Sequence, residues 1–404
     1  MKTNKIPTHW YNIVPFILDV LRLDIPPLLD PESGEHMKCS KLAKVLPLEL
    51  AKQEMNVGKY KTDRLIHIPE EILKLYKTWR RTPLVRARGL EKALNLKKVK
   101  LFYKREDASP INSYKLNSSY VQAYYAKQER VREFIGDTGP GNWGLGMALA
   151  CKAFKIPCTV YMEKANYDSK IDKVKVMERL GAKVISIVTK QGTIAASISK
   201  ALEHVYADER NKLSLGCLTA YSALHNTIIG MELRIQLEEQ GITPNALIGV
   251  VGGGSSFSGL VFPFIEDHRE TTEFIAVESS QVPSFTKGKY RYENPDLVCL
   301  MPRTKMYTLG NKYVPENLGA SGLNYHGKNP LLSLLVHKKI IKAISFTPQE
   351  VDPIQKLFEK AESLKPSPES CYAIKGAIEK AKKWNGRSKT IIFSLTGNAL
   401  ELEV

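Results

Sequence analysis

The chain has 404 residues, of which 43% are hydrophobic and 25% are charged, a balance that excludes intrinsic disorder and predicts two or three domains. Lys and Arg exceed Asp and Glu by 17. These cations are spread along the chain without an aromatic-rich basic block, so we expect neither nucleic acid nor a membrane as a partner.

Short apolar runs and helical patterns alternate through the first half of the chain. The first 75 or so residues are irregular and Pro-rich, with one amphipathic stretch at 41–54, and are expected to wrap a larger body. The pattern then predicts strands at 98–103, 132–137, 158–163 and 182–188, and helices at 118–131, 147–154 and 170–181, the last of which is closed by Gly181. This order is typical of a parallel α/β sheet.

A second series begins near residue 245. Strands are predicted at 246–251, 273–278 and 390–395, and helices at 348–364 and 368–384. Residues 279–345, rich in Gly, Pro, Tyr and Asn, are expected to form a long functional loop region. We infer two α/β halves with a cleft between them.

Lys115 is the first candidate for chemistry. It follows a Pro/Asn/Ser turn and stands at the start of a predicted helix. The unpaired N–H groups and positive end of that helix disfavour the charged form of an amine. A lysine of lowered pKa suits Schiff-base formation, although a surface lysine at a helix start shows the same pattern.

Glycine-rich turns follow two of the predicted strands. The turn at 139–146 exposes consecutive backbone N–H groups that could hold an anion, and Asp137 before it is a possible acid/base group. A plain strand-to-helix turn would look the same.

The second turn is a stronger phosphate signal, because a buried strand runs directly into three glycines, two hydroxyls and a helix: Gly252, Gly253, Gly254, Ser255 and Ser256. No Lys follows at the spacing of an ATP loop, and no G-x-G-x-x-G opens the first strand. A monophosphate therefore fits better than a nucleotide.

Ser394 ends the last predicted strand, where its hydroxyl would point into the cleft. A lysine at a helix start, a monophosphate loop and a serine at a strand end together suit pyridoxal 5'-phosphate. Ordered segments along nearly the whole chain resemble the tryptophan synthase β chain family, in its second, mainly archaeal group; they include PTHWYNIVP, RTPLVRARGLEKAL, LFYKREDASPINSYKLN, DTGPGNWGLGMALA, IGVVGGGSSFSGLVFPFI, VPSFTKGKYRY, MYTLGNKYVPENLGASGLNYHG, SPESCYAIKGAIEKA and IIFSLTG.

The resemblance implies a role for each matching position. Lys115 would carry the cofactor and Asp137 would be the acid/base carboxylate. The remaining cofactor-binding positions would be Tyr114, Asn117, Gly252, Gly253, Gly254, Ser255, Ser256, Glu369 beside the ring, and Ser394 at the ring nitrogen. The substrate would be bound by Thr138, Gly139, Pro140, Gly141 and Asn142, which match the carboxylate loop, and by Asn324.

Several positions depart from the family pattern. The family has His where this chain has Tyr114, Glu at Asp137, and Asn at Ser256. Its carboxylate loop commonly reads Gly-Ala-Gly-Gln, whereas this one contains Pro140 and Asn142. Where the second group has Arg or Asp, this chain has Asn324. These changes concern the reaction and its leaving group more than cofactor binding.

The resemblance also implies a fold, fold-type II, with two three-layer α/β/α domains and the cofactor in the cleft. The expected division is an N-terminal arm with part of the first domain at 1–79, a strand given to the second domain at 80–113, the first domain at 114–235 and the second, phosphate-binding domain at 236–404.

The cysteines give no sign of metal or disulfide chemistry. None forms a CxxC pair or a Cys/His cluster with zinc spacing, and their density is too low for a disulfide scaffold. The apolar stretch at 12–21 is interrupted by Asp19, and no run reaches the length of a membrane span. We expect a cytoplasmic protein without a metal.

The implied activity is a lyase reaction, β-elimination and replacement on L-serine or O-phosphoserine with indole to give L-tryptophan, with room for another donor or acceptor. A deaminase-like lyase acting on serine or threonine and a weakly catalytic cofactor-binding paralogue are the alternatives. The expected partners are these small molecules and a second copy in a homodimer, with an α-type subunit as a further candidate.

Overall fold

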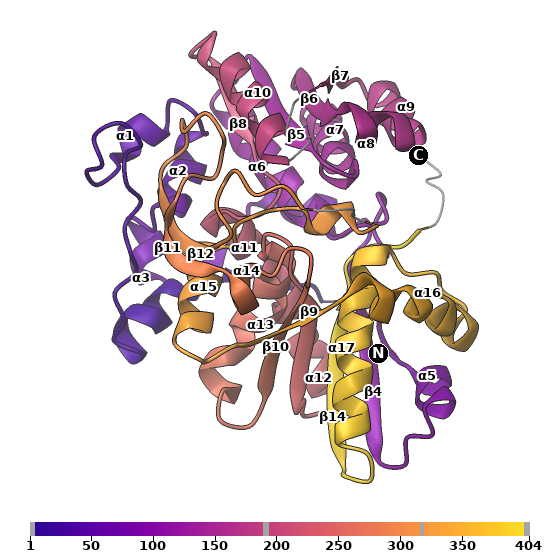
Figure 1. Cartoon of the computed structure of the whole chain (residues 1–404). Coiled ribbons are helices and arrows are strands. Elements are labelled where there is room, and N and C mark those ends of the chain that lie inside the picture. The colour runs from indigo at the N-terminus through magenta and orange to yellow at the C-terminus, as the bar shows by residue number, and fades with distance from the viewer. Residues whose placement is uncertain (1–4, 189–193, 316–318, 400–404) are drawn as a thin grey trace.

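Two separate sheets organise the chain (Figure 1). The computed structural model describes residues 5–188, 194–315 and 319–399. The larger sheet has the order β13-β10-β9-β14-β4-β3, with bounds Lys342–Phe346, Glu273–Ser279, Ala246–Val250, Lys389–Leu395, Val99–Arg105 and Leu84–Arg86. The smaller has the order β7-β6-β5-β8, with bounds Lys183–Ile187, Cys158–Glu163, Glu133–Thr138 and Asn211–Ser214. All neighbours are parallel except β3 and β4.

Helices cover both faces of each sheet, which is why strands such as β9 (ALIGV) are buried along their whole length. On the larger sheet, one layer holds α5 (Arg88–Ala93), α16 (Pro348–Glu362) and α17 (Pro368–Lys383), and the other holds α11 (Ala220–Asn226), α12 (Ile228–Gln240) and α13 (Ser255–His268). On the smaller sheet, α10 (Ile194–Tyr206) covers one face, and α6 (Leu116–Gln128), α7 (Asn142–Phe154), α8 (Lys164–Ser169) and α9 (Ile171–Arg179) lie on the other side.

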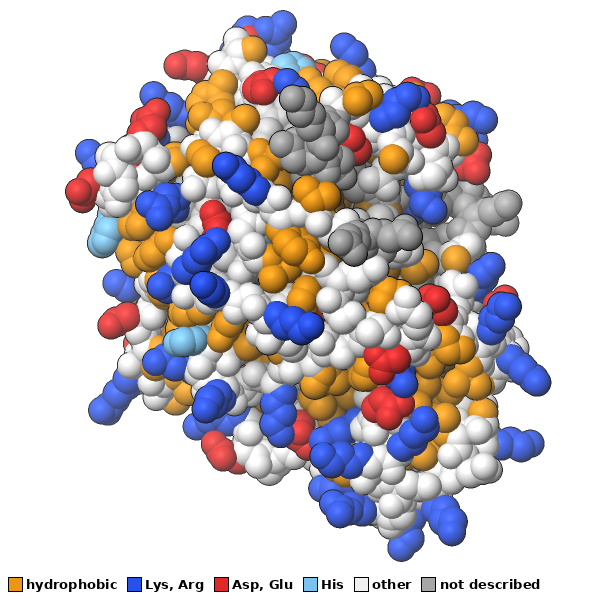
Figure 2. All heavy atoms as spheres, in the orientation of Figure 1, with side chains coloured by type: hydrophobic (Ala, Val, Ile, Leu, Met, Phe, Trp, Pro, Cys, Tyr) orange, Lys and Arg blue, Asp and Glu red, His pale blue; other side chains and the backbone are white. Residues whose placement is uncertain are grey.

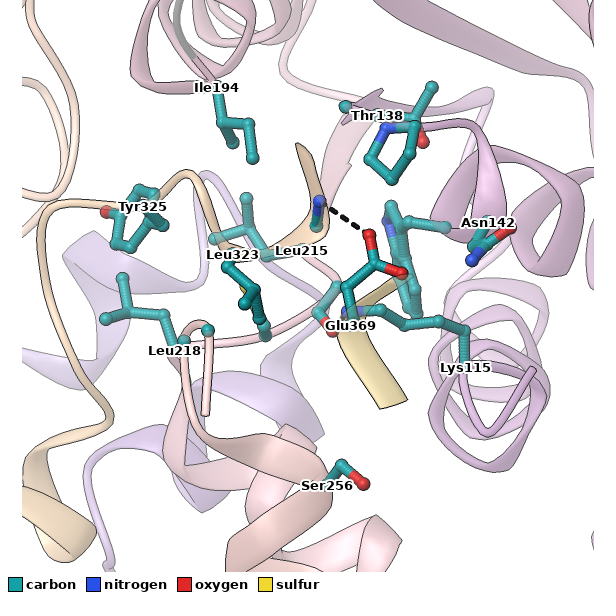
Figure 3. Close-up of a pocket in the computed structure, with 18 of the residues that line it drawn as sticks. Lys115, Thr138, Asn142, Ile194, Leu215, Leu218, Ser256, Leu323, Tyr325 and Glu369 are labelled. Atoms are coloured by element: carbon teal, nitrogen blue, oxygen red, sulfur yellow. Dashed lines mark hydrogen bonds between the residues drawn. The ribbon is translucent and has the colours of Figure 1, made fainter. Parts of the chain in front are cut away.

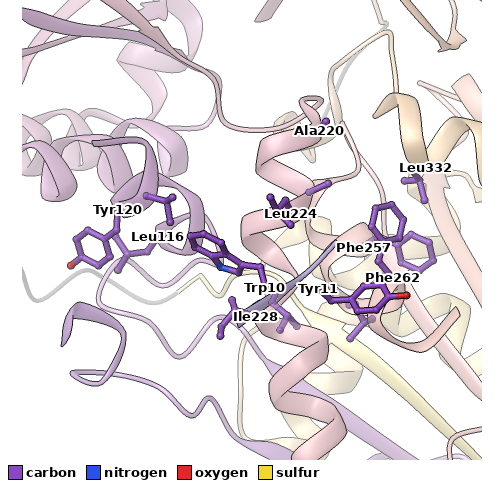
Figure 4. Close-up of a cluster of buried hydrophobic side chains, with 14 of the residues drawn as sticks. Trp10, Tyr11, Leu116, Tyr120, Ala220, Leu224, Ile228, Phe257, Phe262 and Leu332 are labelled. Carbon is purple, nitrogen blue, oxygen red and sulfur yellow. The ribbon is translucent and has the colours of Figure 1, made fainter. Parts of the chain in front are cut away.

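The N-terminal segment packs against this body. Its elements are β1 (His9–Tyr11), η1 (Phe16–Val20), α1 (Cys39–Leu42), α2 (Leu48–Glu54), α3 (Lys59–Thr62), β2 (Leu65–His67) and α4 (Glu70–Tyr76). Trp10 is fully buried, and Figure 4 shows it with Tyr11 among side chains of α6, α11, α12 and α13. The prediction that this segment wraps a larger body is confirmed.

Most predicted elements are confirmed within two or three residues, and β6 has the predicted bounds. Gly181 has φ +96 after α9, as a helix-ending glycine requires. The predicted stretch at 41–54 is two helices, α1 and α2, because Pro47 separates them.

The described parts of residues 279–345 contain more regular structure than predicted. They contain α14 (Ser284–Lys287), β11 (Lys289–Glu293), β12 (Thr304–Thr308), η2 (Ser321–Leu323), α15 (Pro330–His337) and the edge strand β13. These elements are short, and the strands are only partly buried, so their apolar periodicity is weak.

The surface and the cysteines add little chemistry. On the face shown in Figure 2, Lys and Arg are spread over many elements and mixed with Asp and Glu. All six cysteines are free. Within the described ranges, no helix is long and apolar enough to cross a membrane, and no group of three or more His, Cys, Asp or Glu side chains is placed to hold a metal.

A buried charge network joins the larger sheet to two helices. The Arg80 guanidinium donates to Glu232 of α12 at 2.9 Å and to Glu106, after β4, at 2.9 Å. Lys104 of β4 also pairs with Glu232. All four side chains are fully buried, and Arg80 further donates to the Asn117 side chain of α6 at 2.6 Å. The two cations and two anions balance, which offsets the cost of burying them.

Glu232→Gln should destabilise the fold strongly, by about 3–5 kcal/mol, because Arg80 and Lys104 would then share a single buried carboxylate. Thermal and denaturant unfolding of the cofactor-free protein measure this loss. The matched control is Glu203→Gln, in an exposed pair with Lys200, which should change stability by no more than about 0.5 kcal/mol. Equal effects of the two substitutions would contradict the central role of the network.

Candidate active site

A pocket lies between the two sheets, where the carboxyl ends of their parallel strands meet, the usual ligand position in such folds (Figure 3). The smaller sheet contributes the end of β5 and the start of α7. The larger sheet contributes the loop after β9 and the segment after β14. Residues before α6, around η2 and at the start of α17 complete the wall.

Lys115 enters this pocket from the residue before α6. Its Nζ donates to the Gly216 carbonyl at 2.7 Å and lies 4.9 Å from the centre of the Tyr114 ring. Burial lowers the pKa of Lys115, but Tyr114, Cys217 and Asp137 raise it, and the net pKa lies above the ordinary value. The prediction of a lowered pKa is therefore wrong for this state, because the surrounding acceptors and acidic groups outweigh burial.

Asp137 lies at the end of β5 and lines the same pocket. Its side chain is almost completely buried, and burial raises its pKa from 3.8 to about 7, against the opposing effects of its own backbone N–H and of Lys115. A carboxyl group with a pKa near 7 can both accept and release a proton at neutral pH. The predicted acid/base group is thus placed beside the predicted lysine.

The predicted carboxylate loop forms the N-terminus of α7. Thr138, Gly139, Pro140 and Asn142 line the pocket, and the Thr138 hydroxyl accepts from the backbone N–H of Gly144 at 3.1 Å. Backbone N–H groups at the start of a 13-residue helix suit an anionic ligand.

Gly141 has φ +92 and faces Lys173 of α9 instead of the pocket wall. The Lys173 ammonium donates to the Pro140 carbonyl at 3.1 Å and to the Asn142 side-chain oxygen at 2.5 Å, which fastens the loop to α9. Burial lowers the pKa of Lys173 to about 8. The sequence analysis missed Lys173, because nothing in its own segment indicates a partner some thirty residues earlier.

The loop after β9 has the features of a phosphate cradle. Gly252, Gly253 and Gly254 line the pocket, and α13 begins directly after them. A Cβ on Gly252 would lie 2.7 Å from the Gly322 carbonyl oxygen, and Gly254 has φ +110, so larger residues do not fit. The hydroxyl of Ser256 lines the pocket, is buried and has no hydrogen-bond partner among the described residues. An unpaired hydroxyl beside open N–H groups fits a bound phosphate.

Ser255 and Glu369 support the wall. The Ser255 hydroxyl lies 3.4 Å from that of Tyr114, a pocket residue, but Ser255 itself does not line the pocket. Glu369, at the start of α17, accepts from the Gly322 backbone N–H at 3.0 Å, drawn as the dashed line in Figure 3. The predicted Glu369 therefore reaches the pocket and also holds the η2 segment.

The structure does not bring Ser394 to the pocket wall. Ser394 lies within β14, opposite Lys104, and its hydroxyl, unpartnered among the described residues, points toward the space left by Gly249. From this segment, the residue that lines the pocket is Thr396, two residues further along. Alternate residues of a strand face the same side, so the periodicity indicated the right face, but β14 ends at Leu395 and the residue after it reaches the pocket.

Asn117 and Asn324 also lie outside the pocket wall. Asn117 is two residues after Lys115, about 200° around the helix, and its amide bonds with Arg80, Glu106 and Asn226. Asn324 lies between the pocket residues Leu323 and Tyr325, and its side-chain oxygen finds no partner within the described chain. The predicted roles of these two side chains are not supported by this geometry.

One side of the pocket is apolar, and the sequence analysis did not identify it. Figure 3 labels Ile194, Leu215, Leu218, Leu323 and Tyr325 across the pocket from Lys115. The apolar side chains come from α10, the segment after β8, the loop before β12 and the η2 region: Ile194, Ile198, Leu215, Leu218, Met301, Leu323 and Tyr325. Such a wall suits a flat apolar molecule. No local motif marks it, because its members are scattered along the chain.

Known proteins resemble the chain over almost its whole length. A family model described as "Pyridoxal-phosphate dependent enzyme" matches residues 75–397. The tryptophan synthase beta chain of Thermosipho africanus is 38% identical, covering 99% of this chain and 97% of its own. Tryptophan synthase beta chain 2 of Pyrococcus furiosus is 40% identical, covering 98% and 91%.

Solved structures share the fold at lower identity. Threonine deaminase isoform 2 from Solanum lycopersicum matches with a TM-score of 0.64 and 19% identity, over 82% of this chain and 83% of its own. Maize serine racemase matches with a TM-score of 0.62 and 16% identity, over 83% and 96%. These two likenesses establish the architecture and not the reaction.

Asp137→Asn should stabilise the cofactor-free protein increasingly as pH rises. The pKa of Asp137 is higher in the folded state, about 7 against 3.8, so the folded protein binds more protons between these values and loses stability as pH increases. The variant lacks this loss, which is about 4 kcal/mol in full and about 3 kcal/mol between pH 5 and pH 8. Unfolding at pH 5 and pH 8 measures it, with exposed Asp168→Asn as the control; a pH-independent difference would contradict the assignment.

Proposed function

Since the chain belongs to the family of pyridoxal-phosphate-dependent enzymes, within its tryptophan synthase β-like group, we propose that this lyase joins the β-carbon of L-serine or O-phosphoserine to indole, giving L-tryptophan. The observation that carries the proposal is the meeting of Lys115, Asp137, a phosphate cradle and an apolar wall in one pocket. Relatives named tryptophan synthase beta chain support the same activity.

Pyridoxal phosphate, when bound, supplies an aldehyde for an amine and a ring that withdraws electrons from the α-carbon of an amino acid. We assign its phosphate to Gly252–Ser256, its aldehyde to Lys115 and its ring nitrogen to Thr396, which takes the role predicted for Ser394. Glu369 would flank the ring. A neutral hydroxyl at the nitrogen does not impose a positive charge there, which favours loss of the β-substituent over transamination.

The surrounding residues of the chain position the substrate and move protons. The loop Thr138–Asn142, fastened by Lys173, would bind the carboxylate of the donor amino acid. Lys115 Nζ would accept the α-proton. The Asp137 carboxyl would then donate a proton to the departing β-oxygen and hold the indole N–H while the new bond forms.

The apolar wall supports indole as the acceptor. The side chains of Leu215, Leu218 and Ile194 carry no polar group, so they suit contact with the flat hydrocarbon face of an indole ring. Three residues that depart from the family pattern, Tyr114, Asp137 and Asn142, line this pocket. They favour, as a second candidate, a deaminase-like lyase acting on serine or threonine without an acceptor. A cofactor-binding paralogue with little turnover is the remaining alternative.

Association and location are further parts of the proposal. We expect a homodimer, as the family resemblance implies, and an α-type subunit as a possible second partner. Free cysteines and the lack of a membrane-spanning helix in the described ranges agree with the expected cytoplasmic location.

Steady-state assays test the reaction. Tryptophan should form from indole and a serine-type donor, with turnover on free serine below about 1 per second, because Asp137 is one methylene shorter than the family's glutamate. Lys115→Ala should abolish turnover, and borohydride reduction should fix the cofactor at Lys115 in the wild type. Exposed Lys164→Ala is the control. Release of pyruvate or 2-oxobutyrate without indole dependence would favour the deaminase-like reaction instead.

The ring-nitrogen assignment distinguishes Thr396 from Ser394. Thr396→Asp should hold a proton on the ring nitrogen, shift the visible absorption of the bound cofactor and increase transamination. Ser394→Ala should leave the spectrum unchanged, since Ser394 does not line the pocket. The opposite pattern would return the role to Ser394.

A further inference from the structure

A completely buried lysine lies behind the phosphate cradle. Lys328 precedes α15, and its Nζ donates to the carbonyl of Val251 at 3.4 Å, directly before Gly252. The next residue, Asn329, donates its backbone N–H to the Gly253 carbonyl at 2.7 Å. The segment that carries Lys328 is therefore fastened to the Gly-rich loop at two points.

The charge of Lys328 is only loosely matched inside the protein. Its nearest acid, Glu278, lies 3.6 Å away, whereas a direct ammonium–carboxylate bond spans about 2.7–2.9 Å. The Glu278 oxygens accept instead from the Phe285 N–H at 3.0 Å and from the Thr286 N–H and hydroxyl at 2.8 Å each. Glu278 is thus drawn toward α14 and away from the lysine.

A buried cation with such long contacts is costly unless a further anion shares its charge. The pocket side of the same loop presents the unpartnered Ser256 hydroxyl and the N-terminus of α13. Among the described residues that line the pocket, Lys115 is the one Lys or Arg, and its amine is assigned to the aldehyde. Without Lys328, the described part of the chain would offer a phosphate in the cradle only neutral donors.

We propose that Lys328 is a positioning residue whose buried positive charge, acting through the Gly252–Gly254 loop, binds and orients the dianionic phosphate of the cofactor. This inference rests on the proposed assignment of the loop to that phosphate. The cradle therefore selects a phosphorylated over an unphosphorylated pyridoxal by charge as well as by hydrogen bonds.

The test compares the affinities of the cofactor-free protein for pyridoxal phosphate, pyridoxal and inorganic phosphate, measured by absorbance titration and by competition. Lys328→Met should weaken pyridoxal phosphate about 10-fold or more and inorganic phosphate similarly, while pyridoxal changes less than about 2-fold. Lys287→Met, on the exposed end of α14, is the control and should match the wild type.

Loss of Lys328 alone leaves Glu278 buried without a cation, so the double variant Lys328→Met/Glu278→Gln guards against simple misfolding. It should also show a reduced preference for the phosphorylated ligand. Folded variants that keep the wild-type ratio of pyridoxal phosphate to pyridoxal affinity would overturn the inference. A wild type that binds both ligands equally would instead overturn the assignment of the loop.

Discussion

Neutralisation of charge in the interior is the constraint on which the arrangement of this molecule depends. Arg80 holds Glu106 and Glu232 together, and Lys104 completes a balanced set inside the larger sheet layer. Because Asn117 joins the same network, the first turn of α6 is fixed relative to β4. Lys115 lies just before that turn, so its position in the pocket depends on the bonds that Asn117, two residues later, makes with the buried charge network.

The pocket also contains buried charges, and these are only partly compensated by charges of opposite sign. Asp137 and Lys115 share a buried space, Lys173 holds the carboxylate loop, and Lys328 lies behind the phosphate cradle. Burying each of these charges costs free energy of folding, and in the proposed complex the cofactor and the substrate would offset part of that cost, since opposite charges attract more strongly in a dry site than in water.

The sequence predicted the parts of the site that follow directly from strand ends. Asp137, the Gly252–Ser256 loop and the start of α6 all lie where a parallel strand gives way to a helix, and that change of periodicity is visible without a structure. Thr396 was missed by two residues, because β14 ends at Leu395, as predicted, and the pocket is lined by the residue just after the strand and not by one within it. Lys173, Lys328 and the apolar wall could not be predicted, since their partners are brought together only by tertiary packing.

The two halves of the pocket belong to different sheets. The phosphate cradle and Thr396 follow strands of the larger sheet, whereas Asp137 and the carboxylate loop follow β5 of the smaller one. In the proposed assignment, cofactor retention and substrate choice are thus encoded in separately packed layers. On the same assignment, drift in the smaller layer can redirect such an enzyme to a new amino acid while its coenzyme stays in place. Three of the altered positions, Asp137, Pro140 and Asn142, fall in that layer, whereas Ser256 falls in the phosphate loop of the larger one.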